Sequence, residues 1–200
     1  MSDFELHKYS GMAYESAQII TFSENPFKAL PDVDEEMKFH LDVSSVKVHN
    51  LTQKEFDYFV NNYADNYESI YFFHNTKVKD LSALSKLKKV KYLLFYNVGG
   101  TTLWDMSGNE SLKGIMISDS KKMLYDLEQL QYAPNLEELL LFSSMFNKYS
   151  VKTITPLKNC KKLKRLFMLF NTEDKSFFPE EFDFLDKFKY QCDRKRNFTF

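Results

Sequence analysis

A short motif of apolar and polar positions recurs along almost the whole chain. Apolar residues occupy its first, fourth and sixth positions, and a short polar residue usually occupies its ninth. The clearest copies are Tyr67, Ile70, Phe72 and Asn75; Leu136, Leu139, Leu141 and Ser144; and Leu163, Leu166, Met168 and Asn171. Self-similarity at a period of about 20 to 29 residues is typical of a solenoid, in which each unit buries its apolar face against its neighbours.

The motif predicts eight strands separated by short helical segments. The strands are expected to begin near Ala17, Val43, Tyr67, Val90, Leu112, Leu136, Leu163 and Leu185, which places them 22 to 27 residues apart. Between strands, apolar residues recur at every third position, as in Leu81, Leu84, Leu87 and Val90. This step fits a short helix or a 3₁₀ turn that points one edge inward. Each unit is therefore predicted to contain a strand, a turn and a short helix.

The spacing also decides between two α/β folds. Hydrophobic runs such as Leu139 to Phe142 are typical of strands buried on both faces, including those of doubly wound α/β domains. A β-α-β unit, however, needs about 30 residues or more. The shorter period favours an α/β solenoid of about eight units, with a curved parallel sheet on the concave face and short helices and 3₁₀ turns on the convex face.

In this pattern the chain resembles the leucine-rich repeat family, in the short class found in internalins and phosphatase regulatory subunits. Residues 67–89 match that class nearly throughout, with Asn75 at the asparagine position, and the resemblance covers about residues 17–193. It implies that this asparagine ties adjacent turns together through backbone hydrogen bonds. Serine or aspartate can partly replace it, whereas valine and leucine cannot. The ladder is expected to be less regular at the positions that depart from asparagine, which are Leu51, Val98, Ser120, Ser144 and Asp193.

Composition bounds the organisation of the chain. Its 200 residues, 44% of them apolar, are enough for one well-buried core and leave no room for a second sizeable domain. Terminal units of a solenoid must shield the core from water. We therefore expect an N-terminal cap at residues 1–16, a leucine-rich-repeat domain at 17–193, and a C-terminal cap or tail at 194–200.

Charge and cysteine content bear on the compartment and on the partner. The formal net charge of -1 creates no overall field towards nucleic acid or an anionic membrane. The cysteines, Cys160 and Cys192, are too few and too far apart for a disulfide framework. No stretch of about 18 consecutive apolar residues occurs, so no membrane span is expected. These features favour a cytoplasmic protein.

Alternation along each strand sends the fourth and sixth motif positions into the core and the third, fifth and seventh onto the concave sheet face. In the five central strands, nine of the ten fifth and seventh positions are apolar or aromatic, and Ser118 is the tenth. Together these side chains would form a patch on the order of a few hundred Å², as large as the largest patch on a typical monomer.

An aromatic centre with a polar rim is typical of a protein interface. The predicted protein-binding residues are Tyr71, Phe73, Leu94, Tyr96, Met116, Leu140, Phe142, Phe167 and Leu169, with His74, Glu138 and Arg165 at the border. Two alternatives stay open. Strand propensity favours such residues whatever their purpose, and the face could be covered by the N-terminal segment or by a second copy of the chain.

The sequence carries little that indicates catalysis. It contains no Gly-rich phosphate loop, Cys-x-x-Cys pair, His-Glu-x-x-His helix or Gly-x-Ser-x-Gly elbow. No enzyme activity, cofactor or metal site is therefore predicted. Basic residues do cluster at 86–91 and 158–165, where they form either a solvated rim or an edge that meets a phosphate backbone.

These observations predict a non-enzymatic module that binds another protein through an aromatic concave face. The lack of an attached effector resembles standalone repeat proteins that act as stoichiometric inhibitors, and an immunity-type partner of a bacterial toxin is one example by analogy. The alternatives are a homo-oligomeric structural protein that uses the same face and a nucleic-acid binder that uses the basic edge.

Overall fold

We describe the fold from a computed structural model, which describes residues 6, 18–21, 34, 37, 43–143, 150–169, 171–173, 179–193 and 196–199. The strands are β1 (Gln18–Thr21), β2 (Ser45–His49), β3 (Ser69–Phe73), β4 (Tyr92–Tyr96), β5 (Gly114–Ser118), β6 (Glu138–Phe142), β7 (Ser150–Val151), β8 (Arg165–Leu169), β9 (Asn171–Thr172), β10 (Lys187–Asp193) and β11 (Arg196–Thr199). The helices are α3 (Gln53–Asn62) and α4 (Lys121–Tyr125), with 3₁₀ helices η1 (Ala64–Asn66), η2 (Ser82–Lys86), η3 (Glu128–Tyr132), η5 (Thr155–Asn159) and η6 (Pro179–Phe182).

Within these residues one long sheet runs through the molecule in the order β1-β2-β3-β4-β5-β6-β8-β10-β11. Every pair from β1 to β10 is parallel, and β11 closes the end antiparallel to β10. From β2 to β8 neighbouring strands pair without a shift, so Ser69, Tyr92, Gly114, Glu138 and Arg165 form one row across the sheet. The parallel pairing of successive strands from β1 to β10 is consistent with the predicted solenoid.

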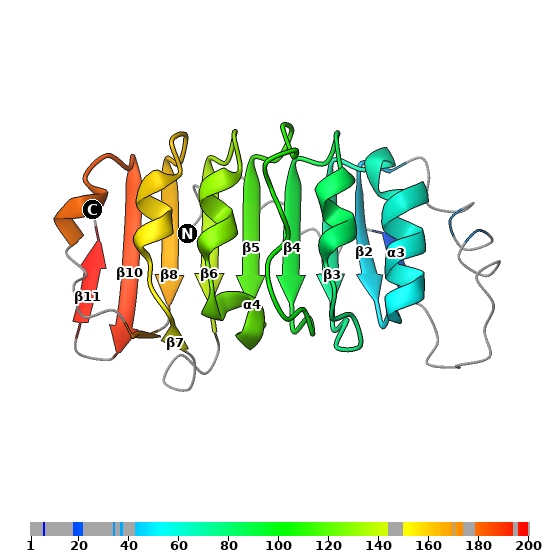
Figure 1. The fold of residues 1–200 in the computed structure, drawn as a ribbon, viewed down its shortest axis with the longest axis horizontal. Helices are drawn as coiled ribbons and strands as arrows, with labels where there is room; N and C mark the ends of the chain where they lie inside the picture. The colour runs from blue at the N-terminus through cyan, green and yellow to red at the C-terminus, as the bar shows by residue number, and fades with distance from the viewer. Residues whose placement is uncertain are drawn as a thin grey trace.

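Within the described residues, α3, η2, η3 and η5 lie on one side of the sheet (Figure 1). Where the apolar step is three residues, the structure forms 3₁₀ helices such as η2 and η3, as the step predicts. α3 is longer because Thr52 caps it: Glu55 N–H bonds the Thr52 side chain, and the Glu55 carboxylate accepts the Thr52 N–H at 2.8 Å. Between β4 and β5 no helix forms, and the buried Trp104 fills this unit with its Nε1 2.7 Å from Asn109 Oδ1.

The main core lies between the sheet and the helices. It takes the fourth and sixth positions of the motif, for example Ile70 and Phe72 of β3 and Leu93 and Phe95 of β4. The Phe72 and Phe95 rings stack with centroids 5.5 Å apart, so aromatic contact continues from one unit to the next. Each fully buried side chain of this size contributes about 1.5 to 3 kcal/mol. The repeated core confirms which positions of the motif point inward.

The asparagine position behaves as the resemblance implies. Asn75 accepts the N–H of Leu51 at 2.8 Å and donates to the carbonyl of Val48 at 2.9 Å, which joins two turns. Ser120 accepts the N–H of Val98 at 3.0 Å but supplies a single bond between turns. Leu51 and Val98 are buried and supply none. Ser144 lies outside the described residues.

The predicted domain boundaries stay a prediction. Of residues 1–16 the structure describes Leu6 alone, and of residues 194–200 it describes strand β11. The regular part of the sheet begins at β1 and reaches β10 without interruption. This span includes nearly all of the predicted repeat domain.

We predict that Asn75→Ala destabilises the fold by about 3 kcal/mol, because it leaves the buried N–H of Leu51 and the carbonyl of Val48 without partners. The measurement is the free energy of unfolding in urea. Asn66→Ala, at an exposed position of η1, is the control and is expected to change stability by less than about 0.5 kcal/mol. Equal losses for the two variants would contradict the ladder.

Candidate protein-binding face

The sheet face turned away from the helices carries a second apolar cluster, distinct from the main core. Its residues form three rows across the sheet. The leading row, at the start of the strands, contains Ser69, Tyr92, Gly114, Glu138 and Arg165; the middle row contains Lys47, Tyr71, Leu94, Met116, Leu140 and Phe167; and the trailing row contains His49, Phe73, Tyr96, Ser118, Phe142 and Leu169. The structure thus confirms the predicted alternation: these residues lie on the face opposite the main core.

The expectation that the middle row faces solvent is wrong. Its predicted site residues are all buried, with exposures of 0 to 6%: Tyr71, Leu94, Met116, Leu140 and Phe167. Glu138, predicted at the polar border, is also buried, with 1% of its surface exposed. The periodicity could show which face these side chains occupy but not what lies on top of them.

Leu6 is one residue that covers this face. It is fully buried and packs in the same cluster as Tyr92, Leu94 and Met116. Gly114 makes room for it: a Cβ atom there would lie 2.9 Å from Leu6 Cγ and 2.8 Å from Tyr92 Cδ1. The sequence left open whether the N-terminal segment covers this face, and Leu6 of that segment does cover it.

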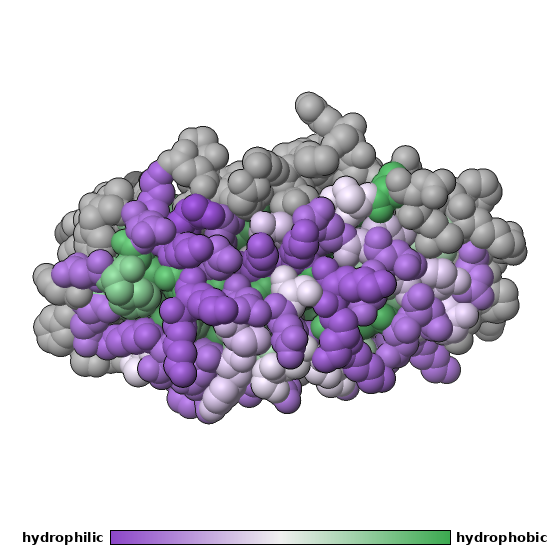
Figure 2. Space-filling model, turned by 90° about the horizontal axis from the view of Figure 1, so that it is seen from above, coloured by the Kyte–Doolittle hydropathy of each residue, from purple (hydrophilic) through white to green (hydrophobic). Residues whose placement is uncertain are grey.

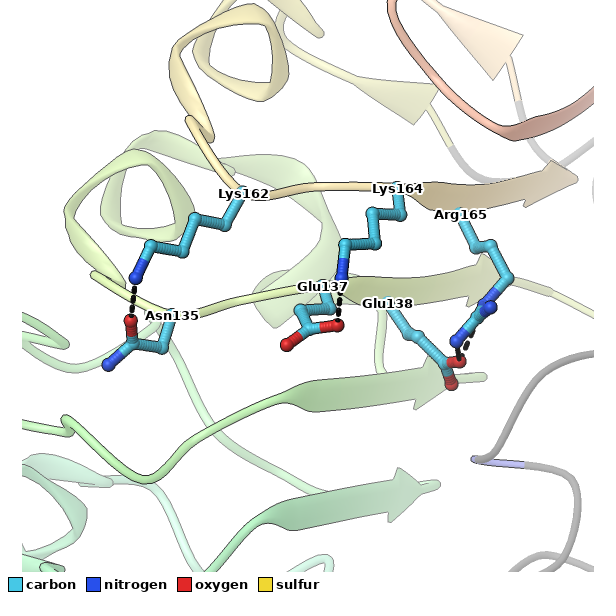
Figure 3. Close-up of polar contacts among 6 residues, drawn as sticks. All are labelled: Asn135, Glu137, Glu138, Lys162, Lys164 and Arg165. Carbon is cyan, nitrogen blue, oxygen red and sulfur yellow. Dashed lines mark hydrogen bonds and ion pairs between the residues drawn. The ribbon is translucent and has the colours of Figure 1, made fainter.

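A charged pair fixes Leu6 at the leading row. Glu138 Oε2 accepts the backbone N–H of Leu6 at 3.0 Å, and Glu138 Oε1 accepts a bond from Arg165 Nε at 2.6 Å. The Arg165 Nη2 atom also contacts this carboxylate. A buried carboxylate is stable only when its charge and lone pairs are compensated. Arg165 and the Leu6 amide provide that compensation (Figure 3, for the Arg165 contact).

Apart from the buried Ser118, the trailing row is half-buried and forms the accessible part of the predicted site. Phe73, Tyr96, Phe142 and Leu169 are all partly exposed and pack against the buried cluster. The Phe73 and Tyr96 rings stack with centroids 5.0 Å apart and 15° between their planes. His74, predicted at the border, meets both rings edge-on, at 4.3 and 5.1 Å. The structure therefore brings five of the predicted residues together at the carboxyl ends of the strands.

A lysine and a histidine border the aromatic pair. Lys47 Nζ lies 4.0 Å from the centre of the Phe73 ring, and His49 lies 4.7 Å from the same ring. Burial lowers the pKa of Lys47. The pKa of His49 is also lowered, first by burial and then by the charges of Lys47 and His74. His49 is thus a neutral aromatic neighbour at pH 7.

A row of left-handed residues ends the strands beside this site. Asn50, His74, Asn97 and Asp119 follow β2 to β5 directly, and each has a φ between 51° and 56°. Asparagine, aspartate and histidine are the non-glycine residues that most often adopt this conformation. The turn holds His74 beside Tyr96 and lets Asn97 Nδ2 bond His74 Nδ1 at 2.8 Å. Polar side chains therefore stand in fixed positions next to the aromatic trailing row.

The basic runs at the strand starts lie beside acidic residues of the preceding unit. Lys91 pairs with Glu68 at 2.9 Å, and Lys164 pairs with Glu137 at 2.7 Å. Seen from this edge, hydrophilic side chains cover most of the described surface (Figure 2). The edge carries both signs of charge, which gives a phosphate backbone less to bind than a continuous basic strip would.

Two features of the described residues bear on metal binding and on nucleophilic chemistry. No set of three or more His, Cys, Asp or Glu side chains is placed there to hold a metal ion. Burial raises the pKa of the Cys160 thiol to about 12, which keeps it from acting as a nucleophile. An open polar hollow of about 260 Å³ on the convex side is lined by Asp126, Gln131, Lys152 and Asn159, among others. Within the part of the chain that the structure describes, no helix is long and apolar enough to cross a bilayer.

Comparison with known proteins adds a family. The model of a family described as a domain of unknown function, DUF4848, matches residues 3–110, which is more than half of the chain. The chain belongs to this family. The DUF4848 match ends between β4 and β5, yet the two strands pair in register from Tyr92 and Gly114 onward. The sheet therefore continues beyond the matched region without a structural boundary.

Two other comparisons complete this picture. No curated protein matches the chain. Among solved structures, the chain is similar to internalin C2 from Listeria monocytogenes, with 18% sequence identity and a TM-score of 0.49 over 74% of this chain. The match spans 58% of the internalin C2 chain.

Sequence reasoning missed the contact between Leu6 and Gly114. The available signal was Gly114 itself, because a glycine inside a strand often marks a close approach by another segment. Nothing in the sequence near Leu6 identified the approaching residue, since Leu6 belongs to no copy of the repeat.

We predict that Arg165→Ala lowers the free energy of unfolding by about 2 to 3 kcal/mol, because it leaves the buried Glu138 carboxylate without its cation. Lys164→Ala, on the same strand edge, is the matched control (Figure 3). Its pair with Glu137 is solvent-exposed, so the expected loss is below about 1 kcal/mol. Urea titration of both variants measures the difference, and similar losses would contradict the burial of Glu138.

We also predict that His49 makes the fold less stable in acid. A histidine whose folded-state pKa lies below the ordinary value of 6.5 stabilises the fold above that value, and this contribution is lost as the pH falls through the lowered pKa. The free energy of unfolding should therefore decrease more between pH 7.5 and pH 5 for the wild type than for His49→Gln. An equal fall in both proteins would show that His49 contributes nothing to the pH dependence.

Proposed function

We propose that this protein is a non-enzymatic leucine-rich-repeat module of about eight units that binds another protein through the trailing half of its concave face. The observation that carries the proposal is the half-exposed aromatic row of Phe73, Tyr96 and Phe142 beside His74. Its side chains are held by contacts with one another and with the buried cluster. A partner therefore meets a surface that is already ordered.

Pre-ordering matters because binding then costs little additional side-chain entropy. Tyr96 stacks on Phe73, and Phe142 packs edge-on against Phe167 at 6.2 Å. Tyrosine and other large aromatic side chains dominate the energetic centres of interfaces, where a surrounding ring excludes water. Here His49, His74 and Asn97 supply the polar groups of such a ring.

The proposal replaces part of the predicted site. Half of the predicted residues are buried and support the surface from beneath or lie under Leu6: Tyr71, Leu94, Met116, Leu140, Phe167 and Glu138. The other half are partly accessible: Phe73, Tyr96, Phe142, Leu169, His74 and Arg165. By analogy with standalone repeat proteins, an inhibitor or immunity-type role in the bacterial cytoplasm is the form of this function that we favour. The two isolated cysteines fit a reducing compartment and bear on the location alone.

The test compares Tyr96→Arg with Tyr132→Arg in affinity capture from the source cells, followed by calorimetry with the purified partner. Tyr132 is the control because it lies on η3, on the convex side, and is 48% exposed. We predict that Tyr96→Arg weakens binding at least about tenfold while Tyr132→Arg leaves it unchanged.

Two results would contradict the proposal. Binding that survives Tyr96→Arg would remove the concave face from the interface. A dimer in light scattering that Tyr96→Arg converts to monomers would instead identify a second copy of the chain as the occupant.

A further inference from the structure

The contact made by Leu6 has the features of a recognition site. Its side chain is fully buried in a cluster that draws on five strands and includes Tyr92, Met116 and Leu140. Its backbone N–H is bound by Glu138, from a position 132 residues further along the chain. A side-chain pocket combined with a backbone acceptor is the way in which peptide-binding proteins recognise one residue of a segment.

The floor of this site is shaped for its occupant. Gly114 lies in the leading row between Tyr92 and Glu138, and it alone of these three lacks a side chain. A Cβ atom at Gly114 would come within 2.9 Å of Leu6 Cγ and 3.1 Å of Leu6 Cδ1. Contacts below 3.0 Å are essentially never seen for real Cβ atoms. The site therefore depends on the absence of a side chain at this one position.

The polar side of the site is also built. Glu138 has 1% of its surface exposed, and Arg165 holds one of its oxygens. The other oxygen accepts the Leu6 amide. A carboxylate fixed in this way accepts hydrogen bonds but cannot donate them, so it selects a backbone N–H over a carbonyl.

We infer that the leading half of the concave face is a binding seat for a leucine side chain together with its backbone N–H, and that Leu6 of the same chain occupies it. An external segment that carries a leucine binds there only by displacing Leu6. This inference deepens the proposed function, because it rests on the same face and names the chemistry of a segment that competes for it.

The tether determines how strong a competitor must be. A segment that belongs to the same chain as its binding site acts at an effective concentration on the order of millimolar. A free peptide of the same sequence therefore binds the wild-type chain poorly, whereas a chain with an empty seat binds it at its intrinsic affinity. This difference is measurable without knowledge of the natural partner.

The experiment uses the full chain and a fluorescent synthetic peptide of residues 1–16 as the probe. We predict that the peptide binds the Leu6→Ala chain at least about tenfold more tightly than the wild type in fluorescence anisotropy, because the tethered competitor has lost its side chain. A peptide with Leu6→Asp should bind the same chain at least about tenfold more weakly. Equal binding of the two peptides would overturn the inference.

Gly114→Ala and Gly108→Ala form the matched pair of chain variants, each made together with Leu6→Ala. Gly114→Ala fills the seat and should abolish peptide binding. Gly108→Ala should leave it unchanged, because a Cβ there meets nothing closer than 3.4 Å. Retained binding in the Gly114→Ala chain would also overturn the inference.

Hydrogen exchange on the wild-type chain keeps the test decisive if the Leu6→Ala chain fails to fold. The Leu6 amide should exchange slowly, and an excess of unlabelled peptide should accelerate its exchange. Free exchange at Leu6 without any peptide would show that the seat is empty in solution and would refute the inference. The pull-down with Tyr96→Arg depends on the trailing row alone, so its outcome separates failure of the proposed function from failure of the seat.

Discussion

Five-residue strands that pair in parallel without a shift impose one constraint on everything else in this molecule. Each strand places a pair of its side chains under the sheet, and the same pair recurs in the next strand, so the main core is a stack of equivalent layers. Phe72 on Phe95 is one such step. The alternating side chains are forced into equivalent rows on the other face, whatever their chemistry. A sheet of this kind cannot hide its second face within the repeat itself.

The protein deals with that face in two ways. Over the leading and middle rows it buries apolar side chains, with Leu6 seated above Gly114 and its amide held by Glu138. Over the trailing row it leaves rings half-exposed but packed, with Lys47 above Phe73 and His74 against Tyr96. The first arrangement resembles a small additional core, and the second resembles an interface without its partner. The step from buried to exposed follows the strand direction and recurs in neighbouring strands.

The charged groups support this division. Glu137 and Lys164 form an exposed pair at the strand edge, whereas their sequence neighbours Glu138 and Arg165 form a pair with the carboxylate almost wholly buried (Figure 3). Each pair joins a glutamate to a basic residue, and the two pairs differ in the face towards which the strand alternation turns them. Only the buried pair is linked to Leu6, so a pair within the repeat holds a residue from outside it. The concave face is thereby tied to the region that precedes the first strand.

The sequence by itself determined the solenoid, the parallel order of its strands and the face on which each side chain lies. These features follow from local spacing: a three-residue step in the helical segments, a two-residue alternation in the strands, and a period too short for β-α-β units. The role of Asn75 came from the resemblance to leucine-rich repeats, and the structure bears it out with two hydrogen bonds between turns. Tertiary structure alone decided that Tyr71, Leu94 and Phe167 are buried rather than open to solvent. Their burial involves a contact between residues more than a hundred positions apart, and Leu6 carries no periodic signal that would reveal its place against Gly114 and Glu138.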